Sequence, residues 1–188
     1  MSAATKHEIR LLVASRIAGL PASERAAAST RAIASLCAST WWTGTTERLV
    51  YHSLPDEVDT ANLIADGAVF LPRVDGSDLV FHRASAALAR HRMGMLEPTA
   101  DQSAWAAPAD GVVCVVCPGR AFDPFGNRIG RGKGYYDRFL RGARTLLGRR
   151  IIAVGICFDE QLLDRLPTTD SDERMDAIVC PSRTIIPD

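Results

Sequence analysis

Five glycines alternate with basic side chains in the segment PGRAFDPFGNRIGRGKGYYDR, which runs from Pro118 to Arg138. Glycine lets a backbone come close to a ligand and adopt positive φ angles. Arginine and lysine beside such a backbone, next to the start of a helix, provide the charge that binds a phosphate. The two tyrosines and the aspartate near the end of the segment mark the expected start of that helix. The spacing therefore predicts a phosphate-binding site.

The segment matches neither of two common nucleotide-binding motifs. A Walker A loop requires G-x-x-x-x-G-K-[ST], and Gly132 and Lys133 supply only its GK pair. Asn127 stands at the position of the first glycine, and Gly134 at that of the hydroxyl residue. The Rossmann pattern G-x-G-x-x-G is absent because Gly130 begins a run in which every second residue is glycine. Anion binding is therefore expected from successive backbone N–H groups and from the flanking charges.

Asp137 is a carboxylate at the end of this segment, and its position allows two roles. An acid in the first turn of a helix can interact with the helix dipole. Alternatively it can bind Mg²⁺, which takes one or two protein carboxylates and completes its shell with phosphate oxygens and water. Asp172 or Asp176, near a later strand, could provide the second carboxylate. The residues alone thus indicate a magnesium–nucleotide site, and they do not identify the acceptor.

Two further groups of polar residues lie far from this segment. Lys6 and Arg10 share one face of a helix predicted over residues 5–19. From the residues alone, a solvated basic face is the simpler interpretation of this pair. Glu57 follows a strand predicted over 49–54, at the type of position where open α/β sheets bind ligands. A ligand contact and a role at the start of the next helix both stay open for this glutamate.

Strands alternate with helices along the chain, while residues 83–110 have no regular pattern. This alternation predicts an α/β fold, a single domain over residues 1–188 with a mostly parallel central sheet flanked by helices. Pro72 is expected to end one strand at residue 71. The apolar patterns predict helices over about 5–19, 21–38, 60–66 and 135–144, and strands over about 49–54, 69–71, 79–82, 112–116, 151–157 and 177–180.

The composition is that of an ordinary globular protein, with 188 residues, 47% of them hydrophobic, and a formal net charge of zero. A balanced charge argues against a broad nucleic-acid surface. The sequence contains no secretory signal pattern and no apolar run of about 18 residues. We therefore expect a cytoplasmic protein with neither a nucleic acid nor a membrane as its partner.

Five cysteines in a chain without a secretory signal pattern favour reduced thiols over disulfides. Cys114 and Cys117 form a C-x-x-C pair, a spacing that in other proteins binds zinc or exchanges electrons. Here the pair lies in a predicted strand, where positions i and i+3 point to opposite faces. We therefore expect no metal or redox site at these two cysteines.

The segment from Pro118 to Leu140 resembles the 5-formyltetrahydrofolate cyclo-ligase family, also called methenyltetrahydrofolate synthetases. The resemblance covers nearly the whole chain, in the same order. It implies a three-layer fold and an enzyme that uses ATP and Mg²⁺ to convert 5-formyltetrahydrofolate to 5,10-methenyltetrahydrofolate, with release of ADP and phosphate. The other matching residues are Lys6-x-x-Ile9-Arg10, the run Asp56 to Thr60, Leu71-Pro72-Arg73, Glu97-Pro98, Phe158-x-x-Gln161 and the aspartates after Pro167.

The resemblance also implies roles for individual residues. Lys133 and Arg131 would neutralise the transferring phosphoryl group and are the expected catalytic residues. Asp137 and Asp172 would hold magnesium, and Glu57 would hydrogen-bond the pterin ring. The other folate contacts would be Arg131, Tyr135 and His52, the last at a pocket position where relatives often carry an aliphatic residue. The ATP-binding residues would be Lys6, Arg10, Arg128, Ile129, Gly130, Arg131, Gly132, Lys133, Gly134, Tyr135 and Tyr136.

Two alternatives stay open at this stage. A non-catalytic paralogue that binds a nucleotide or RNA would use the same arginines on a phosphate backbone. The zero net charge and the absence of a basic tail argue against it. A related kinase or ligase with another acceptor would need the same phosphate-binding residues. The assignment of folate rests on the family resemblance alone, and with it we expect a monomer that acts on a small-molecule folate.

Overall fold

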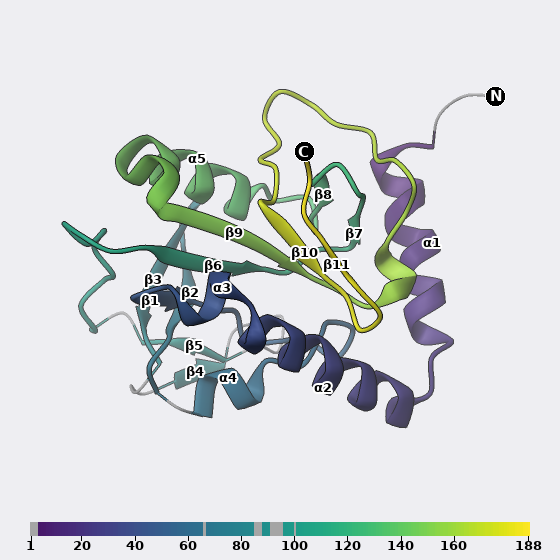
Figure 1. The fold of residues 1–188 in the computed structure, drawn as a ribbon, viewed down its shortest axis with the longest axis horizontal. Helices are drawn as coiled ribbons and strands as arrows, with labels where there is room; N and C mark the ends of the chain where they lie inside the picture. Colours follow the sequence, from purple (N-terminus) through teal and green to yellow (C-terminus); the bar gives the residue numbers. More distant parts are fainter. Residues whose placement is uncertain (1–3, 66, 85–87, 91–95, 100) are drawn as a thin grey trace.

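A seven-stranded sheet runs through the middle of the molecule (Figure 1). The computed structural model describes residues 4–65, 67–84, 88–90, 96–99 and 101–188. The strand order is β11-β10-β9-β6-β1-β2-β3, in which the five inner strands are parallel and the two outer strands are antiparallel to their neighbours. The strands are β1 (Glu47–Leu49), β2 (Phe70–Asp75), β3 (Asp78–Arg83), β6 (Val113–Cys117), β9 (Ile151–Ile156), β10 (Ala177–Val179) and β11 (Thr184–Ile185).

Helices cover both faces of this sheet. Figure 1 shows α5 on one side and α2 on the other. Thr5 and Glu8 form a capping box that starts α1, and Gly19 ends it, as the sequence pattern predicts. The α-helices are α1 (Lys6–Ala18), α2 (Ala22–Ala38), α3 (Thr40–Thr43), α4 (Ala61–Ala65) and α5 (Tyr135–Leu147), with 3-10 helices η1 (Gly148–Arg150) and η2 (Asp159–Gln161).

The side chains of β6 divide the core into two halves. Val113, Val115 and Cys117 belong to the apolar cluster that contains the inner face of α5. Cys114 and Val116 belong to the cluster that contains the inner faces of α1, α2 and α4. The predicted α/β fold with a mostly parallel sheet between helices is therefore confirmed. The two cysteines point to opposite faces as expected, and burial raises the pKa of each thiol to about 12.

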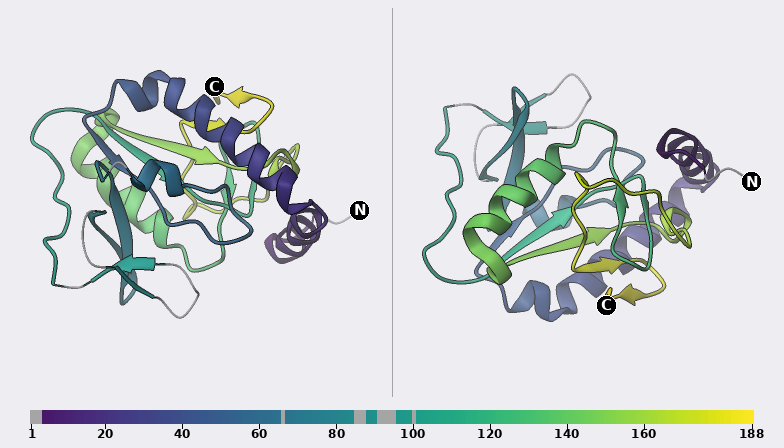
Figure 2. Two further views of the ribbon diagram at one scale, coloured as in Figure 1. Left: turned by 90° about the horizontal axis from the view of Figure 1, so that it is seen from below. Right: turned by 90° about the horizontal axis from the view of Figure 1, so that it is seen from above.

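The order in which the chain adds strands to the sheet changes side between the parallel strands β1 and β6. From β1 the chain continues to β2 on one side, whereas from β6 it continues to β9 and β10 on the other. The connections on the two sides therefore diverge outside the carboxyl ends of β1 and β6, which is where open α/β sheets bind ligands. Figure 2 shows α1 at the end of the sheet toward which β9 points, so this helix lies beside the same crevice.

The strand predicted over 49–54 is shorter and begins earlier, since β1 spans Glu47–Leu49. Just beyond it, the N–H of Val50 still donates to the carbonyl oxygen of Phe70 in β2 at 2.8 Å, and after that the backbone bonds to nearby side chains. The carbonyl oxygen of Tyr51 accepts a hydrogen bond from the hydroxyl of Thr60, and the N–H of Leu54 donates to the carboxylate of Glu57. These local bonds turn the chain out of the sheet and toward the crevice.

Pro72 does not end its strand, contrary to the prediction, because β2 continues to Asp75. Pro72 pairs with Phe81 of β3 in a regular antiparallel ladder. On the opposite side, β1 pairs with β2 only through Leu49 and Phe70. No neighbouring strand therefore requires an N–H from this proline, which is the situation in which a sheet tolerates proline.

The segment 83–110 contains two short antiparallel strands, β4 (Leu88–Arg90) and β5 (Leu96–Pro98). Residues 85–87, 91–95 and 100 lie outside the described part of the chain. Trp105 anchors the end of the segment, since its indole N–H donates to Glu47 at 2.5 Å and its ring lies 6.0 Å from that of Phe139. Among the helices of the described residues, none has the length and hydropathy to cross a membrane.

Candidate active site

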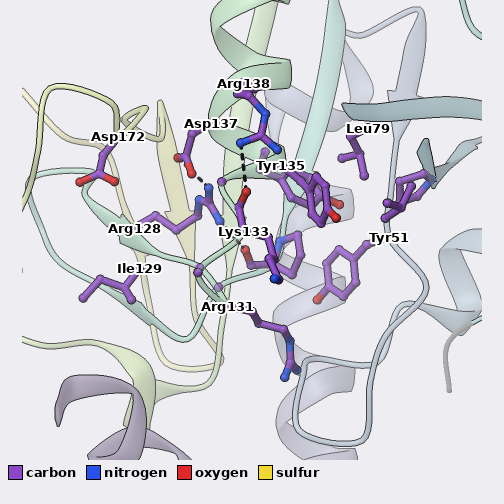
Figure 3. Close-up of a pocket in the computed structure, with 18 of the residues that line it drawn as sticks. Tyr51, Leu79, Arg128, Ile129, Arg131, Lys133, Tyr135, Asp137, Arg138 and Asp172 are labelled. Atoms are coloured by element: carbon purple, nitrogen blue, oxygen red, sulfur yellow. Dashed lines mark hydrogen bonds and ion pairs between the residues drawn. The ribbon is translucent and has the colours of Figure 1, made fainter. Parts of the chain in front are cut away.

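A cavity of about 460 Å³ opens outside the carboxyl ends of β1 and β6 (Figure 3). All the residues to which the family resemblance assigns a contact with ATP, folate or magnesium line this cavity. They come from α1, the loop after β1, the glycine-rich segment, the first turn of α5 and the loop before β10. The fold therefore gathers the predicted site residues in the crevice expected from the sheet topology. Asp176, the other carboxylate considered for magnesium, does not line the cavity and pairs with Arg144 instead.

The glycine-rich segment forms a hairpin of β7 (Ala121–Phe122) and β8 (Arg128–Ile129), followed by a loop that leads into α5. Gly132 and Gly134 in this loop have φ angles of 104° and 66°, which residues with side chains rarely adopt. Arg10 of α1 donates from Nε to the carbonyl oxygen of Gly130 at 2.8 Å. The loop is therefore held by α1 at its start and by α5 at its end.

Arg128 is a buried cation at the base of the loop. Its Nη2 donates to Asp137 Oδ1 at 2.8 Å, and its Nη1 donates to the carbonyl oxygen of Pro118 at 3.2 Å. Its side chain is 3% exposed, and its Nε is buried without a hydrogen-bond partner among the described residues. A buried guanidinium requires a nearby anion. Asp137 therefore balances this charge, in addition to lining the cavity.

Lys6 reaches across the cavity from α1 to Asp172. Its Nζ lies 2.7 Å from Oδ1 and 2.5 Å from Oδ2 of this aspartate. Thr169 supports the same carboxylate through its backbone N–H at 2.7 Å. Partial burial opposes ionisation of Asp172, but the hydrogen bonds from Lys6 and Thr169 outweigh it and hold the pKa of this carboxyl below its ordinary value. The basic face of α1 is therefore engaged in the site.

Arg131 lies in a network with two carboxylates of the loop after β1. Its Nη2 donates to Asp56 Oδ1 at 2.5 Å, and its Nε and Nη2 donate to Glu57 Oε1 at 3.1 and 2.9 Å. Arg120 donates to the other oxygen of Asp56. Burial opposes ionisation of Asp56, but hydrogen bonds from Arg131 and the charges of both arginines hold its pKa below the ordinary value.

Lys133 differs from the other cations of the cavity because it is exposed and forms no ion pair with the described residues. Its position is set through its backbone, since Arg138 Nη1 donates to its carbonyl oxygen at 3.0 Å. Arg138 also donates to the carbonyl oxygen of Ser77 in the β2–β3 turn and lies 5.4 Å from the ring of Tyr135. In Figure 3 the side chain of Lys133 lies in the centre of the cavity.

The cavity has an apolar side opposite its charged side. In Figure 3, Tyr51 and Leu79 lie on one side, whereas Arg128, Asp137 and Asp172 lie on the other. Tyr51 is fixed by a hydrogen bond from its hydroxyl to the carbonyl oxygen of Val58 at 3.0 Å. The cavity can therefore accommodate an aromatic ligand beside a phosphate-bearing one.

Comparison with known proteins identifies the family of this chain. A model of the 5-formyltetrahydrofolate cyclo-ligase family matches residues 2–181. The chain belongs to this family. A 5-formyltetrahydrofolate cyclo-ligase of Mus musculus is 27% identical over 93% of this chain and 92% of its own length. The protein of that name from Escherichia coli K12 is 31% identical over 71% of this chain and 77% of its own length.

Solved structures of cyclo-ligase relatives share the fold. The NMR structure of Aquifex aeolicus 5,10-methenyltetrahydrofolate synthetase superposes with a TM-score of 0.79 and 28% identity, covering 96% of this chain and 92% of that one. A 5,10-methenyltetrahydrofolate synthetase from Mycoplasma pneumoniae superposes with a TM-score of 0.70 and 20% identity, covering 94% of this chain and 98% of that one. The second likeness supports the three-layer architecture alone.

The cyclo-ligase cavity also contains residues that sequence patterns did not single out. Tyr51 directly precedes His52 at the exit of β1, so the strand-end rule that marked Glu57 could have found it. The apolar wall comes from the β2–β3 hairpin, which reads in sequence as ordinary core strands and gives no signal of a site. The residues of this wall are Pro72, Val74 and Leu79 of the hairpin, together with Leu96 of β5.

The described residues of the cyclo-ligase chain contain no group of three His, Cys, Asp or Glu side chains that could hold a metal ion by themselves. Asp137 and Asp172 both line the cavity and are oxygen ligands of the kind that Mg²⁺ prefers. Mg²⁺ usually binds through one or two carboxylates together with substrate phosphates and water. The two aspartates therefore fit a magnesium ion that arrives with a nucleotide.

Proposed function

We propose that this chain is a 5-formyltetrahydrofolate cyclo-ligase, which uses ATP to convert 5-formyltetrahydrofolate to 5,10-methenyltetrahydrofolate, ADP and phosphate. Membership of the family supports this proposal. The observation that carries it is one cavity, at the divergence of the sheet connections, in which a cluster of cations faces an apolar wall. Such a cavity suits two ligands, a nucleotide on the charged side and a pterin on the apolar side.

On the charged side, ATP would contact Lys6 and Arg10 of α1 together with the loop from Arg128 to Tyr136. Backbone N–H groups of the loop and the start of α5 favour anions. Lys133 and Arg10 have no carboxylate partner among the described residues, and Arg10 is bound to the carbonyl oxygen of Gly130, so Lys133 is the exposed cation whose charge is already available. Lys6 and Arg131 would exchange their carboxylates for phosphate oxygens when ATP binds.

The reaction needs ATP because a formamide oxygen is a poor leaving group. In the first step the γ-phosphoryl group transfers to the formyl oxygen of the folate, and ADP leaves. N10 of the folate then attacks the activated formyl carbon, loses its proton, and phosphate departs as the five-membered ring closes. Lys133 and Arg131 would neutralise charge on the transferring phosphoryl group, which is the main contribution that proteins make to such transfers.

Magnesium would be held by Asp137 and Asp172, and when bound it would neutralise phosphate charge. Ion pairs place a cation on each of these carboxylates, Arg128 on the first and Lys6 on the second. The two aspartates would therefore have a positively charged partner with or without magnesium.

On the apolar side, Glu57 and Tyr135 would contact the pterin ring, and Arg131 would border both ligands. His52 lines the cavity, and its Nδ1 is buried without a hydrogen-bond partner among the described residues. A buried polar atom without a partner is costly unless a ligand or water supplies one. We therefore propose that His52 contacts the folate and offers a polar group at this position.

The direct test is to mix the protein with ATP, Mg²⁺ and 5-formyltetrahydrofolate and to follow the absorbance of the methenyl product. We expect turnover that requires all three additions. ATP binding without product formation by well-folded protein would instead indicate the non-catalytic, nucleotide-binding alternative. Formation of ADP with another acceptor, but not with this folate, would indicate a related kinase or ligase.

Two properties complete the proposal, namely a monomeric state and a cytoplasmic location. The first is checked by sedimentation or by size-exclusion chromatography with light scattering, where a mass close to 20.3 kDa is expected. The second is checked by fractionation of the source cells.

A further inference from the structure

Four charged side chains connect the loop after β1 to the glycine-rich segment. Asp56 accepts a hydrogen bond from Arg120 on one carboxylate oxygen and from Arg131 on the other. Arg131 also donates twice to Glu57 Oε1, and the N–H of Leu54 donates to Glu57 Oε2 at 3.0 Å. Residues more than sixty positions apart in sequence are therefore joined, and two members of the network, Glu57 and Arg131, line the cavity.

This network contains two positive and two negative side chains, and they are not equally exposed. The Arg120 side chain is 17% exposed, whereas that of Arg131 is 28% exposed. Asp56 holds both guanidinium groups, while Glu57 holds Arg131 alone. Arg120 can therefore remain on Asp56 if Arg131 leaves, so the departure of Arg131 does not leave Asp56 unpaired.

The network also draws Arg131 away from the phosphate-binding cations. In Figure 3 its side chain runs away from Arg128 and Lys133. As long as Arg131 occupies Oε1 of Glu57, that oxygen is less able to accept hydrogen bonds from a pterin ring. Both proposed ligands therefore favour the same change, because ATP needs the guanidinium and the folate needs the carboxylate.

We propose that Asp56 is a positioning residue that, with Glu57, holds Arg131 in a resting position from which either ligand releases it. The inference rests on the proposed function, since it assigns ATP and a folate to the two sides of the cavity. It requires the first ligand to break the Arg131 contacts and the second ligand to bind a site in which they are already broken. Binding of the two ligands is then positively coupled, and each strengthens the other by the same factor.

The test is calorimetric titration of the full-length protein with 5-formyltetrahydrofolate and with a magnesium complex of a non-hydrolysable ATP analogue, each alone and each in the presence of the other. For the unmodified protein we expect each ligand to bind about fivefold more tightly, or better, when the other is present. For Asp56→Asn we expect each ligand alone to bind about threefold more tightly, with little change in its affinity when the other is present. The coupling factor then falls toward one.

Arg120→Gln is the second variant, and its expected effect has the opposite sign. Without Arg120, Asp56 has only Arg131 as its cation and holds it more strongly. Each ligand alone then binds more weakly, and the coupling factor rises. Asp110→Asn is the charge-matched control, because Asp110 is exposed and precedes β6 at the opposite end of the strand. It should behave as the unmodified protein does.

A purely structural role for Asp56 would weaken binding, whereas a general loss of negative charge would strengthen nucleotide binding equally with and without folate. Either result, or a coupling factor of one in the unmodified protein, overturns the inference. If the folate fails to bind even with the nucleotide analogue present, the proposed function fails and this inference fails with it. If both ligands bind and turnover occurs without coupling, only the role of Asp56 is wrong.

Discussion

Lys133 and Arg131 stand two residues apart on the same loop, yet the structure holds their charges in different ways. The Lys133 ammonium forms no ion pair among the described residues, while the Arg131 guanidinium is bound by Asp56 and Glu57. Glycines separate and flank the two cations, so the backbone allows their side chains to take different directions. Two cations with the same predicted role thus begin from different states.

This difference separates a charge that is available from a charge that must be released. Lys133 can bind an incoming phosphate without giving up a protein partner. Arg131 would have to exchange carboxylates for phosphate, so we expect its net contribution to be smaller than that of a free cation at the same place. Removal of Lys133 should therefore affect the chemical step most, while changes on the Arg131 side should affect ligand affinity.

Lys133→Ala gives the largest expected effect. We expect kcat to fall by about 10²- to 10³-fold, the magnitude seen when one group that stabilises transition-state charge is removed. The fold should be retained because the side chain is exposed. The methenyl absorbance assay and a circular dichroism melt measure the two properties. Arg149→Ala, which removes an exposed cation beyond α5, is the control, and normal turnover by the Lys133 variant would refute the role of this lysine.

Asp137→Asn tests the ion pair of Arg128, a buried cation that, unlike Lys133, has a carboxylate partner. The substitution leaves Arg128, 3% exposed, without its carboxylate. We expect a loss of about 1–3 kcal/mol in unfolding free energy, typical of hydrogen bonds to charged groups. The midpoint of thermal unfolding should therefore fall by several degrees, and the magnesium dependence of nucleotide binding should weaken.

Asp172→Asn is the matched comparison for this prediction. Its partner Lys6 is 26% exposed, so water can replace the lost contact and the stability should change less. The magnesium dependence should weaken in both variants. An unchanged magnesium dependence in the Asp137 variant would leave that residue with its roles at Arg128 and at the start of α5.

Glu57→Gln should mainly raise KM for the folate. The glutamine keeps the shape of the side chain but replaces a charged carboxylate, which accepts hydrogen bonds strongly, with a neutral amide. We therefore expect KM for the folate to rise about tenfold. The KM for ATP should change less, since the proposed contact of this carboxylate is with the folate. If the substitution changed KM for the folate and KM for ATP equally, Glu57 would not act on folate binding alone.

The smallest effect is expected for the thiols in the core. Burial raises the pKa of Cys114 and Cys117 to about 12, and only the thiolate is an effective nucleophile. At pH 8 both groups are protonated and should not react with a disulfide reagent in the folded protein. They should react once the protein is unfolded in denaturant. Rapid reaction of either thiol in the native state would show that the sheet opens readily.

The sequence predicted the layers and the glycine-rich segment well because both depend on local patterns. The continuous apolar run from Val112 to Val116 predicts a strand buried on both faces, and the glycines at 132 and 134 predict a loop with unusual backbone angles. Lys6 and Arg10 show the limit of local patterns. Four-residue spacing places them on one face, but only the packing of α1 beside the crevice distinguishes a ligand-facing pair from a solvated one.

The pairing of charges could not be predicted from the sequence. Lys6 meets Asp172 across 166 positions, and Arg131 meets Glu57 across 74. Many other acids and bases along the chain could have paired instead, and no local rule selects among them. The end of β1 escaped prediction for a related reason, since the hydroxyl of Thr60 takes the Tyr51 carbonyl oxygen that a neighbouring strand would otherwise have bonded.

The two outer strands of the sheet have a consequence for encounters between copies of this protein. β3 and β11 are antiparallel additions to a set of five parallel strands, and β11 has only two residues. These strands are the edges of the sheet, and both offer few open backbone groups. On the outer side of β3, His82 bridges Ala104 and the carbonyl oxygen of Phe81 accepts from the N–H of Trp105, while β11 is too short to present a long template. Edge-to-edge pairing between copies is therefore disfavoured at both ends of the sheet.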